Sequence, residues 1–387
     1  MTRFISEMSY PTTILLGPGA VARLGPQCKH LRFDRPLVIT DKGIVESGVV
    51  ERVVELLKAE GLQPGLFDGV VANPSEKDVD AAVEAQLAHG SDSIVAVGGG
   101  SVIDTAKLVR LMVTHEPPLA RYGVEGDGGL LITGKVSPMI AVPSSAGAGS
   151  EVSRFAAVLI EETGRKVLIG APSLMPDVAI CDPELTVGLP PGPTAWSGMV
   201  AFSHCIESFC AAGLHPLADA LAIDGIARCA RSLVKTVEEP ANIGARTEMM
   251  IAAIEGAAAS EKGLGACNAL ANAVSAVAGV RHGLATAICL GPVLELNRPA
   301  IGGRLAKMAL ALGESVGASQ ESLAAAAVDR VLRLTREANI PSGLKEAGIL
   351  EEQLAGIAEK ASRDASLATN PRELSGEDML VLVRDAF

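Results

Sequence analysis

The sequence predicts two folded parts, an α/β part with a parallel, doubly wound (Rossmann-like) sheet followed by an all-helical part. In the first half, short β-branched runs alternate with segments of helical periodicity, which is typical of parallel strands joined by helices. After the Pro/Gly-rich segment Gly188–Pro193, the chain is rich in Ala and Leu and its periodicities are helical. We therefore expect an α/β part over residues 1–188 and a helical part over residues 189–387.

The expected elements of the first part are short apolar runs bounded by turn residues. Strands are expected at Pro36–Asp41, Ser93–Ser101, Met139–Ser145 and Asp177–Pro183. The segment Val49–Leu62 carries apolar residues at helical spacing, so we expect a helix there.

The second part has long periodic segments. Helices are expected over Ala218–Val237, Arg246–Ala259 and Ser322–Ala338. The charge-free stretch Gly263–Val280 is nearly long enough to span a membrane, but it contains Asn268, Asn272 and Ser275. We interpret it as a buried helix and expect no membrane partner.

Composition excludes several classes of protein. The formal net charge is −12, from 33 basic and 45 acidic residues, so the chain lacks the positive charge that nucleic-acid binding requires. Its seven cysteines are an odd number without a CxxC pair, and we expect them to be reduced and mostly buried. The N-terminus lacks the apolar run of a signal peptide. These features indicate an acidic cytoplasmic globule.

Polar and glycine residues follow the expected strands. Gly98–Lys107 opens a helix after a strand, where backbone N–H groups and the helix dipole favour a phosphate, although an ordinary strand-to-helix turn fits equally well. Asp41 ends a strand, where an acid commonly accepts from a ribose hydroxyl, although it also suits a helix cap. Asn73 has the same ambiguity as a turn residue, and Ser144 and Ser145 follow another strand.

Two histidines lie in the helical part. His204 is in an expected helix and His282 follows a glycine-containing segment. From spacing alone they are a metal pair, proton-transfer groups or packed core residues.

These motifs together resemble the iron-containing (group III) alcohol dehydrogenase family, end to end. The resemblance rests on TDKGIVESG, ANPSE, GGGSVIDTAK, VPSSAGAGSEVS, MPDVAICDPELT, HPLADALA, GVRHGLATAI and NPRELS. It implies an N-terminal dinucleotide-binding domain, an all-helical C-terminal domain, a substrate cleft between them and a homodimer.

The resemblance also assigns NAD-binding positions. Asp41 matches the ribose-binding acid and Asn73 an adenosine-side contact. The remaining positions that it assigns to the cofactor are Gly99, Gly100, Ser101, Asp104, Ser144, Ser145, Ser153, Phe155, Lys166 and Leu185.

The family's metal site is only half retained. Val200 stands where the family has a ligand Asp, and Asn268 where it has a ligand His, whereas His204 and His282 match the other two ligands. Asn272 replaces a further cleft-facing His. Two imidazoles without a carboxylate do not meet the needs of Fe(II) or Zn(II), so we expect no tightly bound metal.

The residues at these positions keep a polar, titratable character. We expect Asn268 and Asn272 to be neutral hydrogen-bond donors to a substrate oxygen, and His204 and His282 to transfer the proton. The resulting hypothesis is an NAD(H)-dependent dehydrogenase or carbonyl reductase acting on a small alcohol, aldehyde or keto acid.

Three alternatives remain at this point. The first is a metal-dependent alcohol dehydrogenase that uses substitute ligands such as Glu207 or Glu261. The second is an enzyme similar to maleylacetate reductases, which also lack the full metal set; separately, Arg281 suits a substrate carboxylate or phosphonate, or an interdomain salt bridge. The third is a catalytically silent dinucleotide-binding protein.

Overall fold

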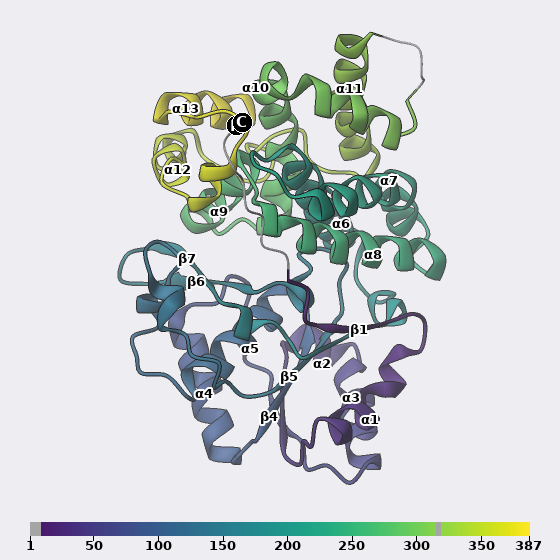
Figure 1. Cartoon of the computed structure of the whole chain (residues 1–387), viewed down its shortest axis with the longest axis vertical. Coiled ribbons are helices and arrows are strands. Elements are labelled where there is room, and N and C mark those ends of the chain that lie inside the picture. The colour runs from purple at the N-terminus through teal and green to yellow at the C-terminus, as the bar shows by residue number, and fades with distance from the viewer. Residues whose placement is uncertain (1–8, 315–318) are drawn as a thin grey trace. The chain divides into compact units, whose positions relative to one another are not determined.

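The computed structural model describes residues 9–314 and 319–387, which form two compact units (Figure 1). One contains Tyr10–Ser145 and Ser150–Gly188 and is called the α/β unit. The other, the helical unit, contains Leu189–Phe387 with Ala146–Gly149 and Ser9. The chain thus leaves the α/β unit for four residues directly after Ser145.

The α/β unit is built on a six-stranded sheet of order β1-β8-β5-β4-β2-β3, in which every pairing is parallel. Its strands are β1 (Thr13–Leu16), β2 (Pro36–Ile39), β3 (Gly65–Phe67), β4 (Ser93–Gly98), β5 (Met139–Pro143) and β8 (Val178–Cys181). Its helices are α1 (Leu24–His30), α2 (Lys42–Glu46), α3 (Val49–Ala59), α4 (Glu76–His89) and α5 (Gly100–Met112). A separate antiparallel hairpin consists of β6 (Phe155–Ile160) and β7 (Arg165–Gly170).

Both faces of this sheet are covered by helices. Leu37 and Ile39 of β2 pack in the cluster that contains residues of α4 and α5, whereas Val38 packs with α1 and α3 (Figure 1). Because successive side chains of a strand point to opposite faces, both sets must be apolar. This explains why the central strands are continuous apolar runs rather than alternating ones.

The helices of the helical unit pack around one large apolar core, to which each of the helices α6 to α13 contributes side chains. Its helices are α6 (Pro191–Cys210), α7 (Pro216–Glu238), α8 (Ile243–Ala259), α9 (Ala266–Ala278), α10 (His282–Ala311), α11 (Gln320–Glu337), α12 (Leu354–Ala361) and α13 (Gly376–Asp385). Small residues allow the helices to approach closely. A Cβ added at Gly256 of α8 would lie 3.0 Å from the Ala201 carbonyl oxygen and 3.2 Å from His204 Cβ, so α8 packs directly on the part of α6 that carries His204.

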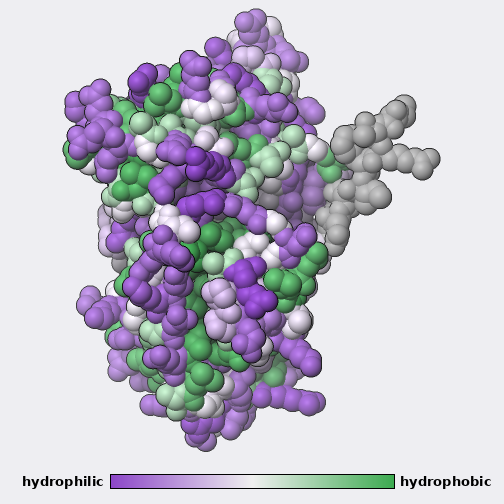
Figure 2. Space-filling view, turned by 90° about the vertical axis from the view of Figure 1, so that its left-hand side faces the viewer, coloured by the Kyte–Doolittle hydropathy of each residue, from purple (hydrophilic) through white to green (hydrophobic). Residues whose placement is uncertain are grey.

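The predicted fold class is confirmed, and the expected strands and helices are present with shifted ends. The stretch around Asn268 is α9, and no helix among the described residues is long and apolar enough to cross a membrane. All seven cysteines are buried and unpaired, as expected. Strands β1 and β3 and the β6–β7 hairpin were not predicted. On the face drawn in Figure 2, hydrophilic residues are spread over the surface with smaller hydrophobic areas among them.

Candidate functional site

Several predicted cofactor residues lie at one edge of the parallel sheet. Asp41, Gly99 and Ser144 each follow the carboxyl end of a strand, and these strands, β2, β4 and β5, are adjacent. Hydrogen bonds join the ends of these strands, because Ser144 N donates to the Gly98 carbonyl at 3.0 Å and Thr40 Oγ1 donates to the Val97 carbonyl at 2.8 Å. Ligands of open α/β sheets bind at this edge.

The Gly-rich turn leads directly from β4 into α5. Gly99 is the N-cap residue of α5 and supplies no side-chain cap, and the helix begins at Gly100 and Ser101. A Cβ added at Gly99 would lie 3.4 Å from Ser145 Oγ, so the Ser145 hydroxyl faces the turn. A helix N-terminus without its own cap can accept an anion.

Asp41 is the N-cap of α2. Its Oδ1 accepts from Ile44 N at 3.0 Å, and its backbone is extended. Asp41 can therefore cap α2 and also accept from a ribose hydroxyl, since the cap engages Oδ1 and leaves Oδ2 for another donor.

Asp104 is engaged inside the α/β unit. Its Oδ1 accepts from Ser150 Oγ at 2.8 Å and its Oδ2 accepts from Ala157 N at 3.1 Å. Lys107 Nζ lies 4.0 Å from Oδ1 and donates to the Phe155 carbonyl at 2.8 Å. One Asp104 oxygen thus holds Ser150, which precedes β6, and the other holds β6 itself against α5.

Two further ionisable side chains beside this contact are buried. Burial lowers the pKa of Lys107 to about 8, and the carboxylates of Asp104 and Glu151 oppose that shift. Burial raises the pKa of Glu151 to about 7, while a backbone hydrogen bond and Lys107 oppose the shift. No local motif of the sequence indicates that Lys107 and Glu151 are buried here.

The remaining predicted cofactor residues belong to the hairpin and to two loops. Asn73 adopts a positive φ of 56° before α4, and the neighbouring Pro74 carbonyl accepts from Leu159 N of β6 at 2.9 Å. Lys166 pairs with Leu159 in register, so it lies near this loop. Ser153 Oγ accepts from Phe155 N at 3.1 Å at the other end of β6.

Leu185 lies in the short 3₁₀ helix η6 (Pro183–Thr186) after β8, where it packs in the core.

In the helical unit, His204 lies on α6 one turn after Val200. Burial lowers the pKa of His204 to about 4, so its imidazole is neutral at pH 7. Its Nδ1 is buried without a hydrogen-bond partner among the described residues. The cause is the packing of α6 and its neighbours, which removes the solvent that an imidazolium needs.

His282 begins α10. The next residue, Gly283, packs against α6, where an added Cβ would lie 2.8 Å from the Trp196 carbonyl oxygen. The His282 carbonyl accepts from Thr286 Oγ1 at 2.9 Å. Arg281, the N-cap residue, is exposed.

Asn268 and Asn272 lie one turn apart on α9 and both contact the segment around η9 (Ala365–Thr369). Asn268 Nδ2 donates to Ser366 Oγ at 2.7 Å and Asn272 Nδ2 donates to Asp364 Oδ2 at 3.0 Å. An ionised carboxylate only accepts, which fixes the orientation of the Asn272 amide. Each amide therefore uses one N–H on this segment and keeps a second.

The donor set does not fit the metal of the family pattern. Val200 is buried and has no donor atom, and Asn268 offers only a neutral amide oxygen in place of an imidazole. Glu207, the candidate substitute ligand, accepts from Cys267 N at 2.8 Å and from Asn268 N at 3.1 Å, so neither of its oxygens is free. In the described residues, no group of three or more His, Cys, Asp or Glu side chains is arranged to hold a metal ion.

Glu207 has a structural position that its sequence context did not indicate. Burial raises its pKa to about 7, opposed by backbone hydrogen bonds from the first turn of α9. No local motif joins Glu207 to residues sixty positions later in the chain, so only the fold reveals this contact.

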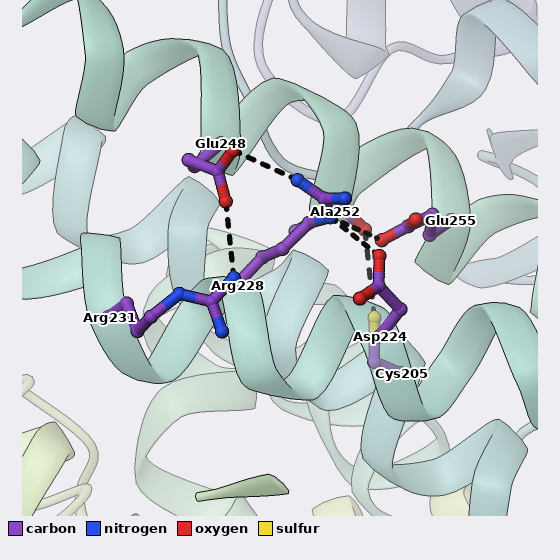
Figure 3. A network of polar contacts seen from close by, with 7 residues as sticks. All are labelled: Cys205, Asp224, Arg228, Arg231, Glu248, Ala252 and Glu255. Carbon is purple, nitrogen blue, oxygen red and sulfur yellow. Dashed lines mark hydrogen bonds and ion pairs between the residues drawn. The ribbon is translucent and has the colours of Figure 1, made fainter.

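A second polar network joins α7 to α8 (Figure 3). Arg228 Nε donates to Asp224 Oδ2 at 2.7 Å and its Nη1 donates to Glu248 Oε1 at 2.9 Å. Glu255 Oε2 lies 3.4 Å from Arg228 Nε, and burial followed by the nearby Asp224 raises the pKa of Glu255 to about 8. This network contains none of the predicted site residues.

Known proteins match the whole chain. Residues 11–183 match the iron-containing alcohol dehydrogenase family, and residues 194–387 match the C-terminal domain of the Fe-containing alcohol dehydrogenase family. The chain is 38% identical over 378 residues to the 4-hydroxybutyrate dehydrogenase of Cupriavidus necator, which covers 95% of this chain and 96% of that protein.

Two solved structures have the same fold. A 1,3-propanediol oxidoreductase superposes with a TM-score of 0.94 at 31% identity, covering 99% of this chain and 100% of that one. The sulfoacetaldehyde reductase of Bifidobacterium kashiwanohense, solved in complex with NAD+, superposes with a TM-score of 0.88 at 27% identity, covering 99% of both chains. The chain therefore belongs to the iron-containing alcohol dehydrogenase family, whose members are NAD-dependent oxidoreductases that act on alcohols.

Proposed function

We propose that this enzyme transfers a hydride between NAD(H) and a small alcohol, aldehyde or keto acid without a tightly bound metal ion. The observation that carries the proposal is the contrast within one chain. The carboxyl edge of the sheet keeps the residues expected for a dinucleotide, whereas Val200 and Asn268 occupy two of the four ligand positions. Residues 1–188 are then the dinucleotide-binding domain and residues 189–387 the substrate domain.

NAD is assigned to the edge formed by β2, β4 and β5. The pyrophosphate would accept from the backbone at Gly99, Gly100 and Ser101, where the dipole of α5 favours negative charge. Asp41 Oδ2 would accept from a ribose hydroxyl and would repel the 2′-phosphate of NADP. Ser144 and Ser145, beside the turn, would supply hydroxyl donors.

The remaining cofactor assignments come from the resemblance. Asn73 and Lys166 lie around the Pro74–Leu159 contact, and Ser153, Phe155 and Leu185 lie elsewhere in the α/β unit.

The proton is assigned to His282. When a hydride adds to a carbonyl carbon, the oxygen becomes an alkoxide and must gain a proton as NADH becomes NAD+. His204 remains neutral at pH 7 because its pKa is about 4, so it would contribute a neutral imidazole rather than an acid. The second amide N–H groups of Asn268 and Asn272 would stabilise the developing alkoxide.

The dimeric state and the cytoplasmic location are also proposed. They follow from the family resemblance and from the acidic composition, respectively. Light scattering after size-exclusion chromatography measures the mass of the assembly and tests the first.

The experiment for the function is a turnover assay with NADH and with NADPH. The substrates are butanal, lactaldehyde and succinic semialdehyde, the last because the Cupriavidus relative is a 4-hydroxybutyrate dehydrogenase. The proposal predicts NADH oxidation with at least one carbonyl compound and a marked preference over NADPH. Tight NADH binding without turnover on a broad panel of carbonyl compounds would instead favour a silent dinucleotide-binding protein.

A further inference from the structure

The first turn of α9 is capped by side chains from other elements. Its N-cap residue, Gly265, has no side chain, yet three successive backbone donors are satisfied. Ala266 N donates to Asn370 Oδ1 at 3.2 Å, Cys267 N to Glu207 Oε1 at 2.8 Å and Asn268 N to Glu207 Oε2 at 3.1 Å. Since a helix leaves its first N–H groups without internal partners, these contacts replace a local cap.

Glycine is the only residue type that leaves room at position 265 for the Glu207 and Asn370 side chains. A Cβ at position 265 would lie 2.7 Å from Asn370 Oδ1 and 2.9 Å from Glu207 Oε1, closer than real Cβ contacts allow. The two distant side chains therefore occupy the space in which a Ser or Asp cap would stand. Helix α9 is thus capped by Asn370 and by Glu207 of α6 instead of by a residue of its own N-terminus.

Glu207 joins two segments that carry predicted site residues. It follows His204 by three residues on α6, so both lie within one helical turn. Its carboxylate spans the backbone N–H groups of Cys267 and Asn268, and its residue is only 6% exposed. A buried, two-point contact of this kind has little freedom to move, because each hydrogen bond to a carboxylate is strong and directional.

A second anchor holds the same helix end independently. Asn370 Oδ1 also accepts from Asn297 Nδ2 at 3.1 Å, and Asn370 Nδ2 donates back to Asn297 Oδ1 at 3.1 Å. The position of Ala266 is thus set by α10, whereas the contacts of Asn268 N and Nδ2 within the described residues are with Glu207 and Ser366.

We propose that Glu207 is a positioning residue for hydride transfer, which fixes the backbone of Asn268 relative to His204 and thereby aims the Asn268 amide at the reacting oxygen. The inference rests on the proposed role of Asn268. Glu207 itself does not touch the substrate. Its effect on turnover must therefore pass through Asn268.

The test is a double-mutant cycle with Glu207→Gln and Asn268→Ala, measured on the best carbonyl substrate and with NADH. Glutamine keeps the shape but places an amide N–H against one of the two backbone donors, so it breaks one bond. Glu207→Gln is expected to lower kcat roughly tenfold with little change in KM or in the Kd for NADH, because a small misplacement of a catalytic group is costly. In the Asn268→Ala background it is expected to lower kcat no further.

Two further variants keep the test decisive. Gly265→Ala displaces Glu207 Oε1, together with Asn370 Oδ1, without removing the carboxylate, and it is expected to reproduce the fall in kcat if Glu207→Gln does not fold. Glu255→Gln changes a partly buried glutamate of the same unit, away from α9, and is expected to leave kcat unchanged.

The outcomes separate the two proposals. If Asn268→Ala leaves kcat unchanged, the proposed role of Asn268 fails and this inference fails with it. If Asn268→Ala lowers kcat but Glu207→Gln does not, or if the two effects on kcat multiply in the double variant, only the positioning role of Glu207 is overturned.

Discussion

Restoring the missing ligands should convert the helical unit into a metal-binding protein. The variant Val200→Asp with Asn268→His places a carboxylate one turn before His204 and a third imidazole on α9. Together with His282 this recreates the donor set of the family pattern, which has the ligand count and the negative charge that a divalent ion needs.

Without metal the variant should be markedly less stable than the wild-type protein. Val200 is 5% exposed, and replacing it removes about 1.5–3 kcal/mol of apolar burial. A buried carboxylate without a partner costs several kcal/mol more. Loss of the Asn268–Ser366 hydrogen bond costs about 1 kcal/mol. A total of about 6 kcal/mol corresponds to a fall in Tm of roughly 12–24 °C for a unit of this size.

Metal should reverse part of this loss. Zn²⁺ at a hundred times its Kd stabilises the folded state by about 2.7 kcal/mol, or roughly 5–10 °C in Tm. The assay is thermal unfolding with chelator and with added Zn²⁺ or Fe²⁺, together with metal content after dialysis. The matched control is Val200→Asn with Asn268→His, which lacks the charge and should bind far more weakly.

The wild-type protein should show no comparable rise in Tm. One tightly held metal ion per chain in dialysed wild-type protein would refute the reasoning and favour substitute ligands. A double variant that folds but gains no metal-dependent stability would show that these four positions do not converge.

Three further predictions concern cofactor preference, the proton donor His282 and the partly buried carboxylate of Glu255. Asp41→Asn keeps the hydrogen bond from Ile44 N but removes the charge, so calorimetry should show a preference for NADH over NADPH that falls at least about tenfold; an unchanged preference would place Asp41 away from the ribose. His282→Ala should lower kcat by about 10²–10⁴ while fluorescence titration gives an unchanged Kd for NADH, and full turnover would remove its assigned role. Because the folded-state pKa of Glu255 is raised to about 8, the unfolded chain releases this proton first and stability falls as pH rises from about 4.5 to 8. The free energy of unfolding of Glu255→Gln, measured in urea, should therefore rise by about 2 kcal/mol relative to wild type between pH 5 and pH 8, a figure already reduced for solvent screening. Parallel curves of unfolding free energy against pH for the two proteins would contradict this prediction.

The central strands could be predicted because their own residues carry the signal, a continuous apolar run. Strands β4 and β5 are buried on both faces, so their sequences are unbroken apolar runs that end in turn residues. Strands β1 and β3 have only four and three residues and lie at the two edges of the sheet, where Ile14 and Leu66 are 41% and 50% exposed. Such short edge strands give no comparable pattern.

The site was predictable only where a motif carries the function. The turn at Gly99 and the loss of ligands at Val200 and Asn268 can be read from the sequence. The contacts of Glu207 and Asp104 could not, because their partners lie 46 to 61 residues away along the chain. One of the alternatives made Glu207 a substitute metal ligand, whereas both of its oxygens accept backbone hydrogen bonds in the fold. The low pKa of His204 likewise depends on how α8 covers α6.

The central claim is that hydride transfer proceeds without a bound metal ion, and turnover of metal-depleted wild-type enzyme tests it most directly. The enzyme is dialysed against a chelator until mass spectrometry detects no Fe or Zn. It is then assayed with NADH and its best carbonyl substrate, before and after addition of Fe²⁺ or Zn²⁺. The account predicts that the depleted enzyme keeps its full kcat and that added metal does not raise it. Loss of turnover on depletion, with recovery when a stoichiometric amount of either metal is restored, would contradict it.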